Sequence, residues 1–131
     1  MGIYDHVDIR VRDRDRARDF YGALLPALGL TEVYDGQEWT TYAESHDGRP
    51  AWQRSFLSLT EKREHAPSEN CIAFRAASRA EVDRLAGVAR AAGAGNIDGP
   101  APYDESAQGY YAVFFEDPDG NRLEICYRED D

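Results

Sequence analysis

The first stretch of the chain alternates apolar and polar residues, which predicts a strand between Tyr4 and Arg12. A helix is expected next, because Asp13 can cap its N-terminus and apolar residues then recur at helical spacing until Gly29 ends it. The strand has an apolar face of Val7, Ile9 and Val11 and a polar face of His6, Asp8 and Arg10.

Three short strands are predicted after this helix, at Thr31–Tyr34, Glu38–Tyr42 and Gln53–Thr60. The first half, approximately residues 3–60, therefore reads as β-α-β-β-β. Residues 61–69 are charged and show no periodicity, so they are interpreted as a linker.

The second half, approximately residues 70–128, repeats this order. A constant shift of 65 residues places Asn70–Arg75 on Asp5–Arg10. Ser78 and Glu81 form a capping box for a helix that ends at Gly93. A short strand near Asn96–Ile97 is expected, then a loop through Pro100 and Pro102.

A β-hairpin is predicted at Tyr110–Tyr127, with its turn at Asp117–Asn121. Leu123, Ile125 and Tyr127 share the packing face of its second strand. Glu124 lies on the other face, where a carboxylate needs a cation, a donor or water to offset its desolvation. Its neighbours on that face are Arg122 and Cys126.

These patterns predict an α+β fold, residues 1–131, made of two tandem βαβββ modules with curved mixed sheets. A helix would cover the apolar face of each sheet, and the polar faces would meet across a central groove. The groove would receive three groups of side chains: His6, Asp8 and Arg10; Cys71, Ala73 and Arg75; Arg122, Glu124 and Cys126.

Charge and cysteine content narrow the function classes. The 15 Lys and Arg residues against 25 Asp and Glu residues give a net charge of −10, which disfavours nucleic acid and anionic membranes as partners. No apolar leader precedes the first strand, and both cysteines lie in predicted strands. We therefore expect a cytoplasmic protein with reduced thiols.

Segments spread along nearly the whole chain form a recognisable set: Asp5-His6-Val7, Phe20-Tyr21, Leu28-Gly29-Leu30, Ile72–Arg75, Gly109–Phe115 and Asp117–Glu124. Together they resemble the vicinal oxygen chelate superfamily, which includes glyoxalase I, extradiol dioxygenases, fosfomycin-modifying enzymes and bleomycin-resistance proteins. The resemblance implies paired βαβββ modules, a divalent ion chelated by neighbouring substrate oxygens, and a homodimer with modules paired within one chain or across two.

The resemblance assigns two metal ligands, His6 on the first strand and Glu124 on the last. Cys71 stands where the pattern normally has a second histidine. As a thiolate it could complete a zinc site, and as a thiol it would be a small buried apolar residue. Leu59, at a shift of 65 from Glu124, cannot bind a metal.

Imidazole and carboxylate suit Zn, Mn, Ni or Fe, and the ion could be absent because Cys71 replaces the histidine. Glu124 is the candidate catalytic residue. Arg10, Arg75 and Arg122 could bind a substrate anion, or they could pair with Asp8 and Glu124. Tyr111 is a candidate substrate contact at the groove mouth.

Two functions remain open. One is a metal-dependent lyase, isomerase or dioxygenase acting on a small molecule with adjacent oxygens. The other is a metal-free protein that sequesters a small aromatic or cationic molecule, as bleomycin-resistance proteins do.

Overall fold

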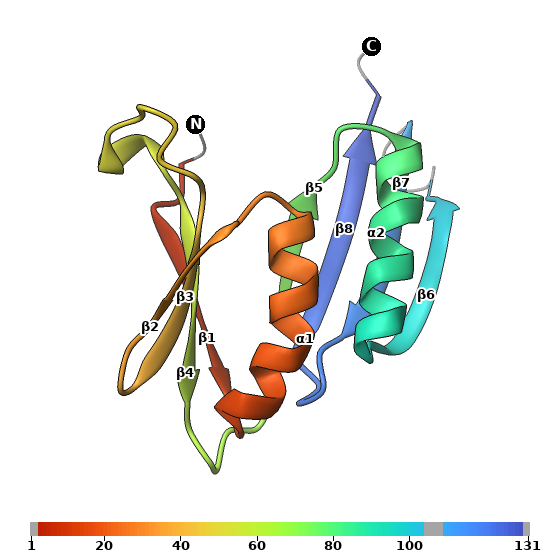
Figure 1. Ribbon diagram of the computed structural model, residues 1–131. Helices are drawn as coiled ribbons and strands as arrows, with labels where there is room; N and C mark the ends of the chain where they lie inside the picture. Colours follow the sequence, from red (N-terminus) through yellow and green to blue (C-terminus); the bar gives the residue numbers. More distant parts are fainter. Residues whose placement is uncertain (1–2, 104–108, 130–131) are drawn as a thin grey trace. The chain divides into compact units, whose positions relative to one another are not determined.

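Each half of the chain folds into one four-stranded sheet and one long helix (Figure 1). The computed structural model describes residues 3–103 and 109–129. Its contacts divide the chain into two compact units, Met1–His65 (unit 1) and Ala66–Asp131 (unit 2). The predicted α+β class with two tandem βαβββ modules is confirmed.

Unit 1 contains a mixed sheet with strand order β1-β4-β3-β2, in which β1 is parallel to β4 and the other pairs are antiparallel. A short 3-10 turn, η1 (Ala51–Gln53), precedes the last strand. The other elements are β1 (His6–Val11), α1 (Arg14–Ala27), β2 (Glu32–Asp35), β3 (Trp39–Ala43) and β4 (Phe56–Glu61).

Unit 2 repeats this topology, with strand order β5-β8-β7-β6 and β5 parallel to β8. Its helix begins after the predicted cap, because the Ser78 side chain accepts a hydrogen bond from the Glu81 amide. The elements are β5 (Cys71–Arg75), α2 (Arg79–Ala92), β6 (Gly95–Pro102), β7 (Tyr110–Glu116) and β8 (Arg122–Arg128).

Both helices end as the sequence predicts. Gly29 follows α1 with a φ of 103°, and Gly93 caps α2 with a φ of 105°. A backbone in this left-handed region lets amides of the following turn bond back to the last carbonyls of the helix. The chain then turns sharply into the next strand in each unit.

The expectation for the segment after α2 was wrong. A short strand near Asn96–Ile97 and a loop through Pro100 and Pro102 were predicted, but β6 continues to Pro102. Proline cannot donate to a strand ladder, so a central strand would reject it. β6 is the edge strand of its sheet and pairs with β7 through two register shifts, which accommodates both prolines.

The β7–β8 hairpin closes through the predicted turn. The Asp117 carboxylate accepts hydrogen bonds from the amides of Asp119 and Asn121, each at 2.9 Å, and the Gly120 amide donates to the Asp117 carbonyl. Asp117 is 3% exposed, so these bonds satisfy a buried carboxylate within its own turn. The turn fixes the register that places Glu124 beside Phe114.

The apolar face of each sheet is covered by the helix of its own unit. α1 lies against β3 and β4, and α2 lies against β6, β7 and β8. Residues on these apolar faces include Val11, Leu59, Val113 and Ile125, all 0% exposed. The opposite face of each sheet, called here its polar face, is therefore the one that carries the candidate chemistry.

Candidate functional site

The polar face of unit 1 is built by the strand register. His6, Asp8 and Arg10 pair with Phe56, Ser58 and Thr60 along β1 and β4, so all six share a face. A depression of about 500 Å³ opens on this face. It is lined by His6, Asp8, Tyr34, Trp39, Thr41, Phe56, Ser58 and Thr60.

His6 is held on this face by two neighbours. Its Nδ1 lies 2.8 Å from Asp5 Oδ1, and its ring stacks on Phe56 with centroids 4.6 Å apart and planes 4° apart. Since an ionised carboxylate only accepts, this contact favours, in the neutral ring, the tautomer with the proton on Nδ1 and the lone pair on Nε2. The side chain remains 50% exposed, so Nε2 is suited to bind a ligand or ion.

The other polar residues of unit 1 are bonded to one another. Arg10 Nη1 lies 2.5 Å from Asp8 Oδ2, and the Thr60 hydroxyl donates to Asp8 Oδ1 at 3.0 Å. Of the two interpretations given for Arg10, the structure shows the pairing with Asp8. A ligand anion would have to compete with this carboxylate for the guanidinium.

The polar face of unit 2 carries the predicted carboxylate. Cys71, Ala73 and Arg75 on β5 pair with Arg122, Glu124 and Cys126 on β8, as the alternation of the sequence requires. Glu124 is only 8% exposed, and its Oε2 is buried without a hydrogen-bond partner among the described residues. Such an atom calls for a cation or a donor.

The electrostatics of Glu124 follow from this burial. Desolvation raises the pKa of Glu124, while a hydrogen bond from Cys126 and the charge of Arg128 oppose the shift. The carboxylate is therefore easier to protonate than a solvated glutamate. A divalent cation at Oε2 would offset the desolvation and favour the ionised form.

Both cysteines are free and lie on the same face as Glu124. Desolvation of the sulfur and the nearby Glu124 carboxylate raise the pKa of Cys71, and the same two causes raise the pKa of Cys126. Neither sulfur is activated as a thiolate in the metal-free protein. This favours a thiol at Cys71, but the residue is exposed, so the expectation that the thiol would be buried is wrong.

The remaining candidate substrate-binding residues lie on different faces of the sheet of unit 2. Arg75 and Arg122 reach the polar face of unit 2, where Arg122 Nη2 lies 4.0 Å from Glu69 Oε1. Tyr111 lies on the opposite face: its hydroxyl donates to Asp83 Oδ1 on α2 at 2.6 Å. The structure thus does not bring Tyr111 to the side of the sheet that holds Glu124.

The position equivalent to Glu124 in unit 1 was predicted incorrectly as Leu59. His6 pairs with Phe56 and Cys71 with Arg122, offsets of 50 and 51 residues, so the repeat shifts by one residue before the last strand. The equivalent residue is Ser58, whose hydroxyl lies 2.8 Å from that of Thr41. Leu59 instead faces α1 and the core.

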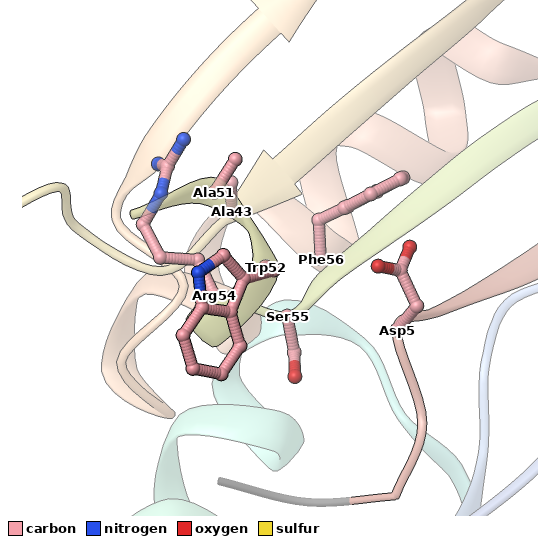
Figure 2. Close-up of a pocket in the computed structure, with 7 residues that line it drawn as sticks. All are labelled: Asp5, Ala43, Ala51, Trp52, Arg54, Ser55 and Phe56. Atoms are coloured by element: carbon pink, nitrogen blue, oxygen red, sulfur yellow. The ribbon is translucent and has the colours of Figure 1, made fainter. Parts of the chain in front are cut away.

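Sequence reasoning also missed the two residues that hold His6. Asp5 and Phe56 line a smaller depression of about 230 Å³ at the start of β1 and β4, together with Trp52 and Arg54 (Figure 2). Asp5 adjoins His6 in the sequence, which was the available signal. Phe56 could be found only from the parallel pairing of β1 with β4.

The metal hypothesis was tested against the donors present. Within the part of the chain that the structure describes, no three His, Cys, Asp or Glu side chains of one unit gather as a metal site. His6 Nε2 and Glu124 Oε2 are each suited to a divalent ion by chemistry, and Oε2 also lacks a hydrogen-bond partner among the described residues. The use of these two atoms for one ion, with or without Cys71, stays a prediction.

Comparison with known proteins identifies the family. The model of the glyoxalase/bleomycin resistance protein/dioxygenase superfamily matches residues 3–125. The chain belongs to this superfamily. The predicted resemblance is thereby confirmed.

Among the described residues, no helix is long and apolar enough to span a membrane.

Members of the superfamily with solved structures share the fold. A glyoxalase/bleomycin resistance protein from Albidiferax ferrireducens T118 is 23% identical, with a TM-score of 0.78 over 98% of this chain and 100% of its own. The fosfomycin resistance protein FosX from Listeria monocytogenes is 18% identical, with a TM-score of 0.68 over 98% of this chain and 95% of its own. At these identities the likeness shows the fold alone.

A sequence relative is the uncharacterised protein YqjT from Bacillus subtilis (strain 168). It is 27% identical over an alignment that covers 92% of this chain and 94% of YqjT.

Proposed function

We propose that this protein is a metal-dependent enzyme that acts on a small molecule with adjacent oxygen atoms. His6 and Glu124 would hold a divalent ion such as Zn, Mn, Ni or Fe, within one chain or between two chains of a homodimer. The observation that carries the proposal is the buried Glu124 Oε2, which lacks a hydrogen-bond partner among the described residues. A carboxylate in this state is destabilised until a cation or donor reaches it.

The bound ion would supply Lewis-acid chemistry, polarising a substrate oxygen as negative charge develops there. The chain supplies the rest. Nδ1 of His6 is bonded to Asp5, which leaves Nε2 as the donor atom. If displaced from the ion, Glu124 would act as the base, because its raised pKa without an ion brings the carboxylate closer to the range in which it can accept and return a proton.

Cys71 stands at the position where the superfamily pattern normally has a second histidine ligand. Metal binding requires the thiolate, and burial together with Glu124 raises the pKa of Cys71. We therefore propose His6 and Glu124 as the principal ligands and give Cys71 a secondary role. Replacing Cys71 with His restores the imidazole of the superfamily pattern, which binds an ion in its neutral form, and should increase metal affinity at neutral pH.

The first test is metal analysis of protein purified without chelator, followed by thermal denaturation with added Zn, Mn, Ni or Fe(II). Binding to the native state alone raises the melting temperature with ion concentration. His6→Ala and Glu124→Gln should each abolish this rise. Glu32→Ala, which removes a carboxylate bonded to a different histidine, His46, is the matched control and should keep it.

The proposal fails if the parent protein contains no transition metal and gains no stability from any of the four ions. If an ion does bind, activity is sought with that ion, using small molecules that carry a vicinal diol, a hydroxyketone or an epoxide. Loss of turnover in EDTA and its recovery on adding back the same ion is the expected result.

A second candidate is metal-free sequestration of a small aromatic or cationic molecule. It is favoured by the neutral Cys71 thiol and by the aromatic residues Tyr34, Trp39 and Phe56 that line the larger depression. The net charge of −10 favours a cation. Tight binding in EDTA without turnover would support this function over the enzyme, and binding that disappears with chelator would exclude it.

A further inference from the structure

We propose that Asp5 is a positioning residue that sets the tautomer and orientation of His6 for binding a divalent ion. This inference rests on the proposed function, in which His6 is a ligand. It assigns a role to a residue outside the ligand set, and it follows from two contacts of the imidazole that are independent of each other.

The first contact sets the proton. Asp5 Oδ1 lies 2.8 Å from His6 Nδ1. A carboxylate can only accept, so the imidazole must donate from Nδ1, and the lone pair is left on Nε2. An ion would then meet a nitrogen that already presents its lone pair.

The second contact sets the plane. Phe56 is the partner of His6 in the parallel pairing of β1 with β4, and the two rings stack 4.6 Å apart with only 4° between their planes. Stacking alone permits the ring to flip about its χ2 bond, which exchanges the position of each nitrogen with that of a ring carbon. The bond to Asp5 selects one of the two orientations.

The position of Asp5 suits this role. Asp5 immediately precedes β1, so it is not bound by the alternation that sends neighbouring strand residues to opposite faces. Figure 2 shows the Asp5 carboxylate and the Phe56 side chain at one edge of the smaller depression. Both therefore approach the His6 ring from the end of β1 and β4 where the polar face of unit 1 begins.

The pair is not chiefly a device for stability. The side chains of His6 and Asp5 are 50% and 68% exposed, and exposed ion pairs contribute little to folding. Removal of Asp5 should therefore change the imidazole without unfolding the protein. A positioning role predicts this separation, and a structural role does not.

The experiment uses the full chain. Long-range proton–nitrogen correlation spectra of metal-free, nitrogen-labelled protein report the tautomer of each histidine at a pH where it is neutral. Calorimetric titration with Zn(II) reports affinity. Asp5→Ala removes the acceptor, and Asp5→Asn keeps a carbonyl oxygen that can still accept from Nδ1.

We expect the Nδ1–H tautomer for His6 in the parent and in Asp5→Asn, and a shift toward Nε2–H in Asp5→Ala. Zinc affinity should fall about tenfold in Asp5→Ala, the lower end of the range for partners of metal-bound histidines, because the pair is exposed. Asp5→Asn should recover part of this loss. Glu32→Ala is the control: it changes His46, whose Nδ1 lies 2.6 Å from Glu32, and leaves both His6 readouts unchanged.

The proposal is overturned if His6 is the Nε2–H tautomer in the parent, or if Asp5→Ala leaves its tautomer or the zinc affinity unchanged. Failure of the proposed function looks different, because the parent then binds no divalent ion although Asp5→Ala still changes the tautomer. That result overturns the positioning role as well, since the orientation would serve no ion.

Discussion

Unit 1 places a pair of hydroxyls at the centre of its polar face, where unit 2 places a carboxylate. Ser58 lies 2.8 Å from Thr41 and is satisfied by it, whereas Glu124 has an oxygen with no hydrogen-bond partner among the described residues. The two sheets share strand order and helix length. Their difference teaches that the fold of each unit needs only its apolar face, so the polar face is free to carry chemistry.

The largest expected effect tests the shared part of this comparison. Leu59 and Ile125 are equivalent by strand register, and both are 0% exposed beneath a helix. Leu59→Ala and Ile125→Ala should each lower the free energy of unfolding by about 2–5 kcal/mol, because each leaves a cavity in a packed core. Chemical denaturation followed by circular dichroism measures this. A loss below about 1 kcal/mol in either would contradict the equivalence of the two apolar faces.

A smaller effect tests the part that differs. Desolvation raises the pKa of Glu124 in the folded state above the ordinary value of 4.5. The folded protein then binds the proton more tightly than the unfolded chain, so stability falls as pH rises from about 4.5 through the raised pKa. In metal-free protein, Glu124→Gln should remove this fall and raise the free energy of unfolding at neutral pH by about 1 kcal/mol.

Ser58→Ala is the matched change in unit 1. It removes a satisfied hydroxyl, so it should lower the free energy of unfolding by about 1 kcal/mol at every pH. Denaturation curves at several pH values separate the two variants. Equal pH dependence in Glu124→Gln and the parent would show that Glu124 is not desolvated as described.

The third expected effect concerns Tyr111 and the face of the unit 2 sheet on which it lies. Tyr111 donates to Asp83 on α2, on the side of the sheet opposite Glu124. Tyr111→Phe should cost at most about 1 kcal/mol of stability and leave metal and ligand affinity unchanged. Titration calorimetry beside denaturation checks both statements. A large loss of ligand affinity would return Tyr111 to the binding site.

The smallest expected effect is at the rim of unit 2. Arg122 is 51% exposed and lies 4.0 Å from Glu69, so Arg122→Ala should change the free energy of unfolding by less than about 0.5 kcal/mol. Its effect on an anionic ligand is the informative measurement. If Arg122 binds substrate, affinity falls while stability stays constant, and the fall is reduced at high salt.

Much of the fold could be predicted because its signals are local. Asp13 and Ser78 mark where the helices begin, Gly29 and Gly93 mark where they end, and alternation separates the faces of β1 and β8. β6 could not be predicted, because proline is excluded only from central strands, and the place of a strand within its sheet is not a local property.

The candidate site divides in the same way. The sequence by itself determined that Cys71 and Glu124 share a face, since side chains alternate along each strand and the repeat aligns the strands. Only the tertiary structure decided that Ser58, and not Leu59, is the counterpart of Glu124, that Phe56 supports His6, and that Glu124 is desolvated. The physical reason is that strand pairing and burial depend on residues about 50 positions apart along the chain, whereas alternation and capping depend on immediate neighbours.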